Sequence, residues 1–528
     1  MSRAEIAHSV TRGTFYLALE KAAAVGSGLL YFALLLRWLG PTKYGIITLA
    51  LSFAGLATTA TGNFEMFLER FAADYHARGL LRTLRRAHLL ALGVKLALGA
   101  VAGAVVFALA QPLAAGFDSP DLAVLLPVLA VFVAADGLST TGRATLYGLQ
   151  QFKWVSGIAL AFHGAKTVMV GGLWFTGQGL PQLAAGLTAL TVAQGLAATA
   201  VPLWYLRRAR DEAPAAGAGA VPVGHGLLRQ MIGYCVPLLG ARLTFMSGQN
   251  LSRIVLGKMF TPHELGLFSF AYQTIERFVE LAHTLPAAML PALTRLVARG
   301  EHERLTRVFD QSHRIVQVVA CTLSFGLFVF ARELTLFVGS PLFASAIPLL
   351  QIMALVPIAR TAQQPLTMLF QALKRPATVL HLALLKFGVE FACYFALVPA
   401  VGVAGAVIAN LTGAAVSYAA ALGVLAVAFP AGTNERLRNL GRSLLLFAPL
   451  LVAALAADAL LPTAPSLALR AALVPVAAAG VFALALVTRY DLDQLSAIPL
   501  ESAWMRRLRD LLVAVVGRLA RAVEPRSA

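Results

Sequence analysis

Long apolar segments follow one another through almost the whole chain, and they limit the fold more than any other feature of the sequence. About 20 apolar residues in a helix cross the roughly 30 Å hydrocarbon core of a bilayer, and by this rule the sequence predicts about fourteen spans. Because lipid offers the backbone no hydrogen-bond partners, each span should be an α-helix. The predicted spans are residues 14–37, 45–67, 87–110, 121–142, 153–175, 181–206, 228–257, 264–291, 314–338, 343–371, 376–399, 402–429, 440–461 and 467–488.

The composition supports an all-α, polytopic membrane protein. Charged residues make up 13% of the chain and hydrophobic residues 59%, whereas roughly 25% of an ordinary soluble domain is charged. This excludes a soluble enzyme, a disordered chain and a disulfide framework. The three cysteines, Cys235, Cys321 and Cys393, lie in apolar stretches without metal-ligand spacing. They are interpreted as packing residues, and the sequence predicts no metal site and no cofactor.

The basic residues indicate how the chain is oriented. If the N-terminus is cytoplasmic, about 30 of the 43 Lys and Arg residues fall on the cytoplasmic side, as the positive-inside rule requires. Both termini should therefore be cytoplasmic. The net charge of +18 is then largely a topology signal and an attraction for anionic membrane lipids, with no nucleic-acid partner. The basic residues left on the other side are Arg37, Lys43, Lys258, Arg332 and Arg470.

This orientation predicts that a reporter active only in the cytoplasm will be active when it is fused after Gly217. The fusion is measured by reporter activity, with membrane insertion of the fusion checked by immunoblotting. A silent reporter on a stably inserted protein would overturn the topology.

The sequence predicts two related six-helix bundles followed by two further helices. Pro41 to Gly45 and Pro262 to Gly266 follow the first and seventh spans at an offset of 221, and two further landmarks repeat at 223. Because each repeat would hold six spans, an even number, both would enter the membrane from the same side and would be parallel repeats. The predicted regions are a bundle over 1–206, an Ala/Gly/Pro-rich cytoplasmic linker over 207–227, a bundle over 228–429, helices 13 and 14 over 430–490, and a cytoplasmic tail over 491–528.

Within that tail, Trp504 to Val523 carries apolar residues at helical spacing with arginines between them. This pattern predicts an amphipathic helix on the cytoplasmic leaflet. The alternative is a short soluble helix packed on the bundle.

Four stretches of the chain resemble one family of membrane proteins. They are RWLGPTKYGIITLALSF (37–53), the helix 8 region (264–309), the helix 10 region (348–376) and VGVAGAVIANLTG (401–413). Together they resemble the bacterial polysaccharide transporters, O-antigen-type oligosaccharide flippases of the multidrug/oligosaccharidyl-lipid/polysaccharide exporter superfamily. The chain departs from the family pattern at Ser252, where Asp is usual, and at Phe268, where Tyr is common.

The resemblance implies two bundles around a central cavity, with alternating access across the bacterial plasma (inner) membrane. It implies a polyprenyl-diphosphate-linked oligosaccharide as the substrate, moved for surface polysaccharide or lipopolysaccharide biosynthesis. Polysaccharide polymerases and glycosyltransferases would then be the partner proteins.

Charged residues within the spans are the candidate functional residues, because each costs at least about 2.5–3.5 kcal/mol to insert. A diphosphate that crosses the membrane needs cations, and the arginine fork suits phosphate oxygens. The alternative is ion pairing, since Lys386 and Glu390 are four residues apart and Arg277 and Glu280 three. The predicted substrate-binding residues are Arg242, Arg277, Arg360, Lys386 and Lys166, and the candidates for proton or Na⁺ coupling are Asp136, Glu276, Glu280 and Glu390.

Three functions remain open on the sequence. The leading hypothesis is the oligosaccharide flippase. The second is a multidrug/cation antiporter or a peptidoglycan-precursor flippase of the same superfamily. The third is a membrane-embedded polysaccharide polymerase or ligase, which the outer connections of at most about a dozen residues disfavour, because they leave little room for a catalytic loop. The chain is therefore predicted not to be an enzyme.

Overall fold

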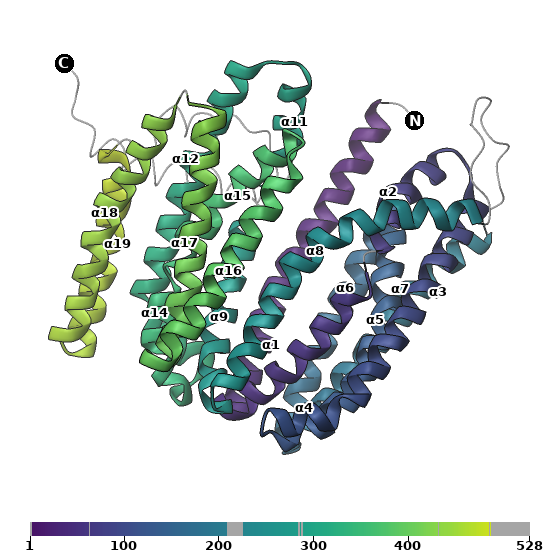
Figure 1. The fold of residues 1–528 in the computed structure, drawn as a ribbon, viewed down its shortest axis with the longest axis horizontal. Helices are drawn as coiled ribbons and strands as arrows, with labels where there is room; N and C mark the ends of the chain where they lie inside the picture. The colour runs from purple at the N-terminus through teal and green to yellow at the C-terminus, as the bar shows by residue number, and fades with distance from the viewer. Residues whose placement is uncertain are drawn as a thin grey trace. The chain divides into compact units, whose positions relative to one another are not determined.

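The computed structural model describes residues 3–62, 64–208, 225–283, 286, 289–430, 432–484 and 486, and within these ranges the chain is helical, with no strand. The side chains of residues 3–25, 77, 208, 225, 236–249, 281, 291 and 292 lie outside this description. The helices are α1 (Arg3–Ala60), α2 (Phe64–Ala77), α3 (Leu81–Ala108), α4 (Ala110–Gly116), α5 (Pro120–Gly148), α6 (Phe152–Phe175), α7 (Leu180–Arg208), α8 (His225–Met259), α9 (Pro262–Ala282), α11 (Leu290–Ala298), α12 (His302–Val329), α13 (Ala331–Leu334), η1 (Thr335–Gly339), η2 (Pro341–Ala346), α14 (Ile347–Met353), α15 (Val356–Ala372), α16 (Pro376–Val401), α17 (Val403–Ala428), α18 (Thr433–Leu460) and α19 (Thr463–Ala483) (Figure 1).

Every predicted span coincides with one of these helices or with neighbouring ones, so the all-α, multi-pass fold is confirmed. In the described part of the chain, nine helices are long and apolar enough to cross a membrane, or up to eleven if each of two bent pairs forms one span. The number fourteen stays a prediction.

The first two predicted spans meet at a break inside α1. Gly40 has φ 65° and ψ 177°, outside the helical region, and Pro41 follows it directly. A positive φ favours glycine, and proline suits the first turn of the helix that restarts. This break separates the span predicted over 14–37 from the one predicted over 45–67, and the last residues of the second span belong to α2.

The chain divides into two compact units. Unit 1 comprises residues 1–269 and 337–343, and unit 2 comprises residues 270–336 and 344–528. The division falls within α9 and not at the predicted linker, most of which (209–224) lies outside the described residues, as do residues 487–528 of the predicted tail. The predicted domain boundaries and the amphipathic tail helix therefore stay predictions.

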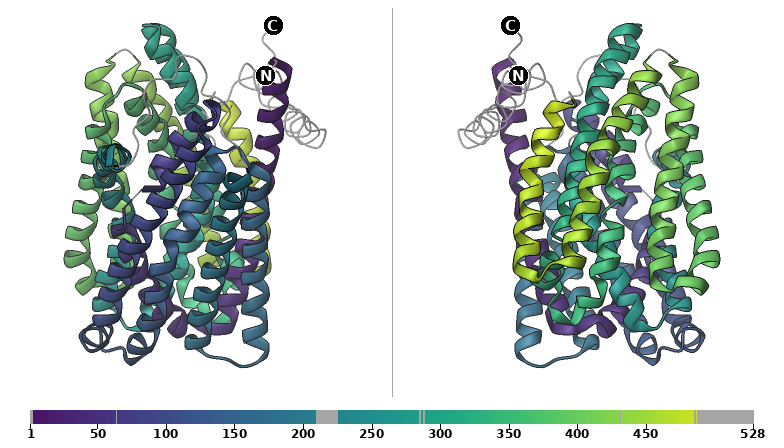
Figure 2. Two further views of the ribbon diagram at one scale, coloured as in Figure 1. Left: turned by 90° about the vertical axis from the view of Figure 1, so that its right-hand side faces the viewer. Right: turned by 90° about the vertical axis from the view of Figure 1, so that its left-hand side faces the viewer.

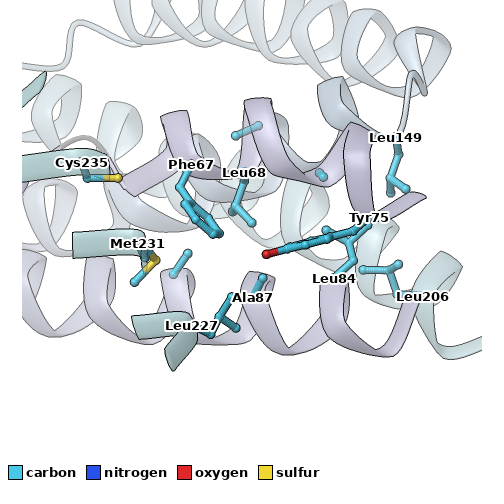
Figure 3. Packing of buried hydrophobic residues seen from close by; sticks show 13 residues of the cluster. Phe67, Leu68, Tyr75, Leu84, Ala87, Leu149, Leu206, Leu227, Met231 and Cys235 are labelled. Carbon is cyan, nitrogen blue, oxygen red and sulfur yellow. The ribbon is translucent and has the colours of Figure 1, made fainter. Parts of the chain in front are cut away.

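Buried apolar side chains attach the first half of α8 to unit 1. Phe67 and Tyr75 of α2, Leu84 of α3, and Met231 and Cys235 of α8 are all almost fully buried in one cluster (Figure 3). Close packing of such side chains gives many van der Waals contacts, which hold helices together. The cluster therefore explains why α8 belongs to unit 1, although the sequence places it after the linker.

A close crossing joins the second half of α1 to the start of α9 within unit 1. A methyl group built on Gly45 would lie 1.9 Å from the carbonyl oxygen of Pro262, and one built on Gly266 would lie 1.9 Å from that of Pro41. Only glycine permits so close an approach of two helix backbones. The contact is reciprocal, because the glycine of each repeat lies against the proline of the other.

Polar side chains at this crossing also pair equivalent positions of the two repeats. The Thr48 hydroxyl donates a hydrogen bond to the Ser269 hydroxyl (3.4 Å), and Thr42 Oγ1 lies 3.4 Å from His263 Nδ1. Each pair is separated by 221 residues, the offset of the predicted repeat. Contacts between equivalent residues indicate a local two-fold axis at this crossing, as expected where matching segments of two sequence repeats pack together.

In unit 2, α16 with α17 and α18 with α19 form two helical hairpins (Figure 2). Arg470 of α19 fixes the second hairpin to the end of α12. Its guanidinium lies 2.6 Å from a Glu333 oxygen and 3.1 Å from Asp458 Oδ1, and it donates to the Val329 carbonyl. At the other end of α18, Arg436 lies 2.6 Å from Asp310 of α12. Ion pairs therefore hold α18 and α19 to α12 and α13 at both ends.

Replacing Arg470 by methionine should lower the melting temperature of the detergent-solubilised protein. The substitution leaves Glu333 and Asp458 without their cation, and breaking a buried pair costs about 3–5 kcal/mol, with the lower value expected because both carboxylates are partly exposed. Arg332→Met is the matched control, since Arg332 directly precedes Glu333 in α13 and its side chain is exposed. Equal melting temperatures of the two variants would show that the ion pairs do not hold α19.

Candidate functional site

Six of the predicted site residues lie on three helices of unit 2. We call this set the charge network. It consists of Glu276, Arg277 and Glu280 on α9, Arg360 on α15, and Lys386 and Glu390 on α16.

Arg360 and Glu276 form the most buried contact between two helices of the network. Nη1 of Arg360 contacts Oε1 of Glu276, and Nη2 lies 3.3 Å from Oε2, so the guanidinium meets the carboxylate as a fork. The side chains are 13% and 9% exposed. The Tyr272 hydroxyl, one turn earlier on α9, also donates a hydrogen bond to Glu276. Such bidentate pairs are among the strong charge-assisted contacts, so each partner neutralises the other.

Lys386 and Glu390 form the second buried pair. Nζ of Lys386 lies 3.0 Å from Oε2 of Glu390, while Oε1 accepts hydrogen bonds from the Tyr394 hydroxyl and, at 3.0 Å, from Nδ2 of Asn410. Gly413 of α17 lets α16 approach at this point, because a methyl group there would lie 3.1 Å from the Glu390 Cβ. Glu390 therefore has donors from two helices besides its lysine.

Arg277 and Glu280 form the third pair, and this pair is exposed. The nitrogen–oxygen distance is 3.5 Å, and the side chains are 44% and 65% exposed. Both lie inside the span predicted over residues 264–291. A charged pair this exposed is costly against lipid and is normally found facing a bundle interior or a water-filled cavity. This face of α9 is therefore the part of the network that is suited to contact with water and with a charged ligand.

The three pairs are coupled electrostatically. Glu276 lies in the field of Lys386 as well as of Arg360, and Arg360 lies in the field of Glu390. Glu280 lies in the fields of Arg277, Arg360 and Glu276. Three cations and three carboxylates make the network neutral overall, so an anion that binds to one of its cations meets a cation that already has a carboxylate partner.

Amide and hydroxyl groups line the same helices. Nε2 of Gln364 lies 3.1 Å from Nδ1 of His283, and Nε2 of Gln363 donates to Ser417 at 2.9 Å.

Sequence reasoning did not single out Tyr272 and Tyr394. The signal was present, because each tyrosine is four residues from a network carboxylate and so lies one helical turn away.

The remaining predicted residues belong to unit 1. The Lys166 ammonium lies 3.9 Å from the centre of the Tyr31 ring, a cation–π contact between α6 and α1. Asp136 is half-buried on α5. Arg242 lies on α8, and its side chain is outside the described residues. Unit 1 also holds a buried ion pair of its own, with Lys95 Nζ 3.2 Å from a Glu65 oxygen.

Among the residues that the structure describes, no group of three or more His, Cys, Asp or Glu side chains is placed to hold a metal ion.

A family model described as polysaccharide biosynthesis protein matches residues 34–348, which is more than half of the chain. The chain belongs to this family. The match confirms the resemblance seen in the sequence. No curated protein matches the sequence.

Solved structures give the fold of this polysaccharide biosynthesis family member. An inward-facing multidrug resistance MATE family transporter of the MOP superfamily is similar with a TM-score of 0.58 and 15% identity, over 76% of this chain and 92% of that one. The lipid II flippase MurJ, in an inward closed conformation, is similar with a TM-score of 0.53 and 9% identity, over 97% of this chain and 98% of that one. The chain therefore has the fold of MOP-superfamily transporters.

Proposed function

We propose that this protein is a flippase that moves a polyprenyl-diphosphate-linked oligosaccharide across the plasma membrane for surface polysaccharide biosynthesis, by alternating access. Its family membership supports the polysaccharide part of the proposal, and its MOP-superfamily fold supports transport rather than enzymatic chemistry. The N- and C-termini would be cytoplasmic, as the basic residues predict.

The observation that carries the proposal is the charge network on α9, α15 and α16. A diphosphate loses its hydration when it leaves water, and guanidinium groups replace that hydration with paired hydrogen bonds. Arg277 is exposed on a predicted span, and Arg360 lies in the same network. We therefore assign Arg277 and Arg360 to the diphosphate first, and Lys386, Lys166 and Arg242 remain the further predicted substrate-binding residues.

Two related functions share the fold. MurJ, a lipid II flippase, is similar over 97% of this chain, which keeps a peptidoglycan precursor as the second candidate substrate. A multidrug/cation antiporter is less well supported, because the family model that matches the chain is described by polysaccharide biosynthesis, and the neutral charge network offers a cationic drug no excess of carboxylates.

Deletion of the gene in its native host tests the proposal. We expect loss of the surface polysaccharide and accumulation of the lipid-linked oligosaccharide at the inner face, with normal peptidoglycan. Surface polymer is measured by gel electrophoresis, and the lipid-linked precursor by mass spectrometry of extracted lipids. Accumulation of lipid II with intact surface polymer would instead support the second candidate.

A further inference from the structure

We propose that Glu276 and the diphosphate of the substrate compete for the guanidinium of Arg360, and that Glu276 takes up a proton when the substrate binds. This inference rests on the proposed function and adds to it a proton-linked binding step at a named residue. It also selects one of the four predicted coupling carboxylates.

The geometry of the pair makes the competition necessary. Both terminal nitrogens of Arg360 are directed at the two oxygens of Glu276. A diphosphate that uses the same fork must displace that carboxylate, because a bidentate contact occupies the same donors. A buried carboxylate that loses its cation is strongly destabilising, and neutralisation by a proton relieves this cost.

The surroundings of Glu276 decide what can replace Arg360. From α9 it faces Tyr272, which donates one hydrogen bond, and Glu280, which repels it. From α16 it lies in the field of Lys386, but Lys386 is held 3.0 Å from Glu390. The remaining charged or titratable groups near the pair are Arg277, whose partner is Glu280, and His283, which contacts Gln364. With Arg360 withdrawn, Glu276 therefore keeps one neutral donor and, among the side chains that the structure describes, no cation of its own.

Glu390 differs from Glu276 in this respect. If Lys386 turned towards a ligand, Glu390 would retain the Tyr394 hydroxyl and the Asn410 amide, which both donate to Oε1. Hydrogen bonds to a carboxylate favour its charged form. Glu390 is thus suited to remain an anion through the cycle, and the exchange of a proton is assigned to Glu276.

The linkage is reciprocal, since a proton on Glu276 frees Arg360 for the substrate and the substrate on Arg360 favours that proton. Binding should therefore tighten as the pH falls, by a factor on the order of a hundredfold in total, which is within the range of typical coupling between two sites. In Glu276→Gln the side chain is neutral at every pH, so this variant should bind at all pH values as tightly as the wild type binds at low pH.

Isothermal titration of the full-length protein in detergent with farnesyl diphosphate tests the proposal. Heats measured in buffers of different ionisation enthalpy should reveal uptake of about one proton per wild-type binding event, in line with the linkage above. Glu276→Gln should take up less than the wild type. Glu65→Gln, the matched control, neutralises a buried carboxylate that is paired with Lys95 in unit 1, and it should take up as much as the wild type. Protonation of the ligand itself contributes equally to every variant, so it cancels when proton uptake is compared between them.

Proton uptake that is the same in Glu276→Gln and wild type would overturn the inference. So would wild-type binding that responds to Na⁺ at constant pH without proton uptake, since a metal cation would then neutralise the carboxylate. If Glu276→Gln does not fold, the wild-type heats still decide, because binding without proton uptake contradicts the inference and leaves the proposed function standing. Absence of any diphosphate binding would contradict both.

Discussion

Replacing Arg360 by alanine should both destabilise the protein and abolish export of the surface polymer. The substitution leaves the Glu276 carboxylate, 9% exposed, without its cation. Removing one partner of a buried pair costs about 3–5 kcal/mol, and protonation of the orphaned carboxylate should keep the loss near the lower value. Thermal unfolding in detergent measures the first effect, and polymer export in a complemented deletion strain measures the second.

The double variant Glu276→Ala with Arg360→Ala separates stability from function. Removal of both charges eliminates the unpaired carboxylate, so we expect the melting temperature to recover towards that of the wild type. Export should remain absent, because the fork for the diphosphate is missing. A stable double variant that exports polymer normally would show that the pair is structural and that the substrate does not use Arg360.

Substitution of Gly45 by alanine should be one of the two most damaging additions of a single methyl group in unit 1. The new carbon would lie 1.9 Å from the carbonyl oxygen of Pro262, and that oxygen belongs to a helix backbone that cannot rotate away. The two helices must separate, and overpacking of this kind costs about 1–3 kcal/mol or more. We expect a lower melting temperature and loss of export.

Gly93→Ala is the matched control for this substitution. Gly93 lies inside α3, and a methyl group there meets nothing within 4 Å. Alanine is favoured over glycine in a helix by about 1 kcal/mol, so this variant should be as stable as the wild type or more stable. The reciprocal change Gly266→Ala should behave like Gly45→Ala. If Gly45→Ala matched Gly93→Ala in stability and export, the close helix crossing would be wrong.

The positions of the helices could be predicted because each span needs its own apolar length. Their ends could not, since α12 begins at His302, twelve residues before the predicted span, and hydropathy marks only the apolar part of a helix. The offset of 221 identified Gly45 and Gly266 as equivalent. It gave no sign that each lies against the proline of the other repeat, because that contact depends on how the helices pack.

Spacing determined how much of the candidate site was predictable. Lys386 with Glu390 and Arg277 with Glu280 lie one turn apart on single helices, and both pairs form. The pairing of Arg360 with Glu276 joins residues 84 positions apart, so local spacing contains no trace of it. Periodicity alone also could not show that Arg277 is exposed while Arg360 is buried.

Translocation by purified protein in liposomes tests the central claim most directly. A fluorescent polyprenyl-diphosphate oligosaccharide is placed in both leaflets, and its accessibility to a membrane-impermeant quencher is followed over time. We expect rapid exchange between leaflets with wild-type protein, and only the slow background of protein-free vesicles with the stable Glu276→Ala, Arg360→Ala double variant. Wild-type vesicles that exchange the lipid no faster than protein-free vesicles would contradict the account.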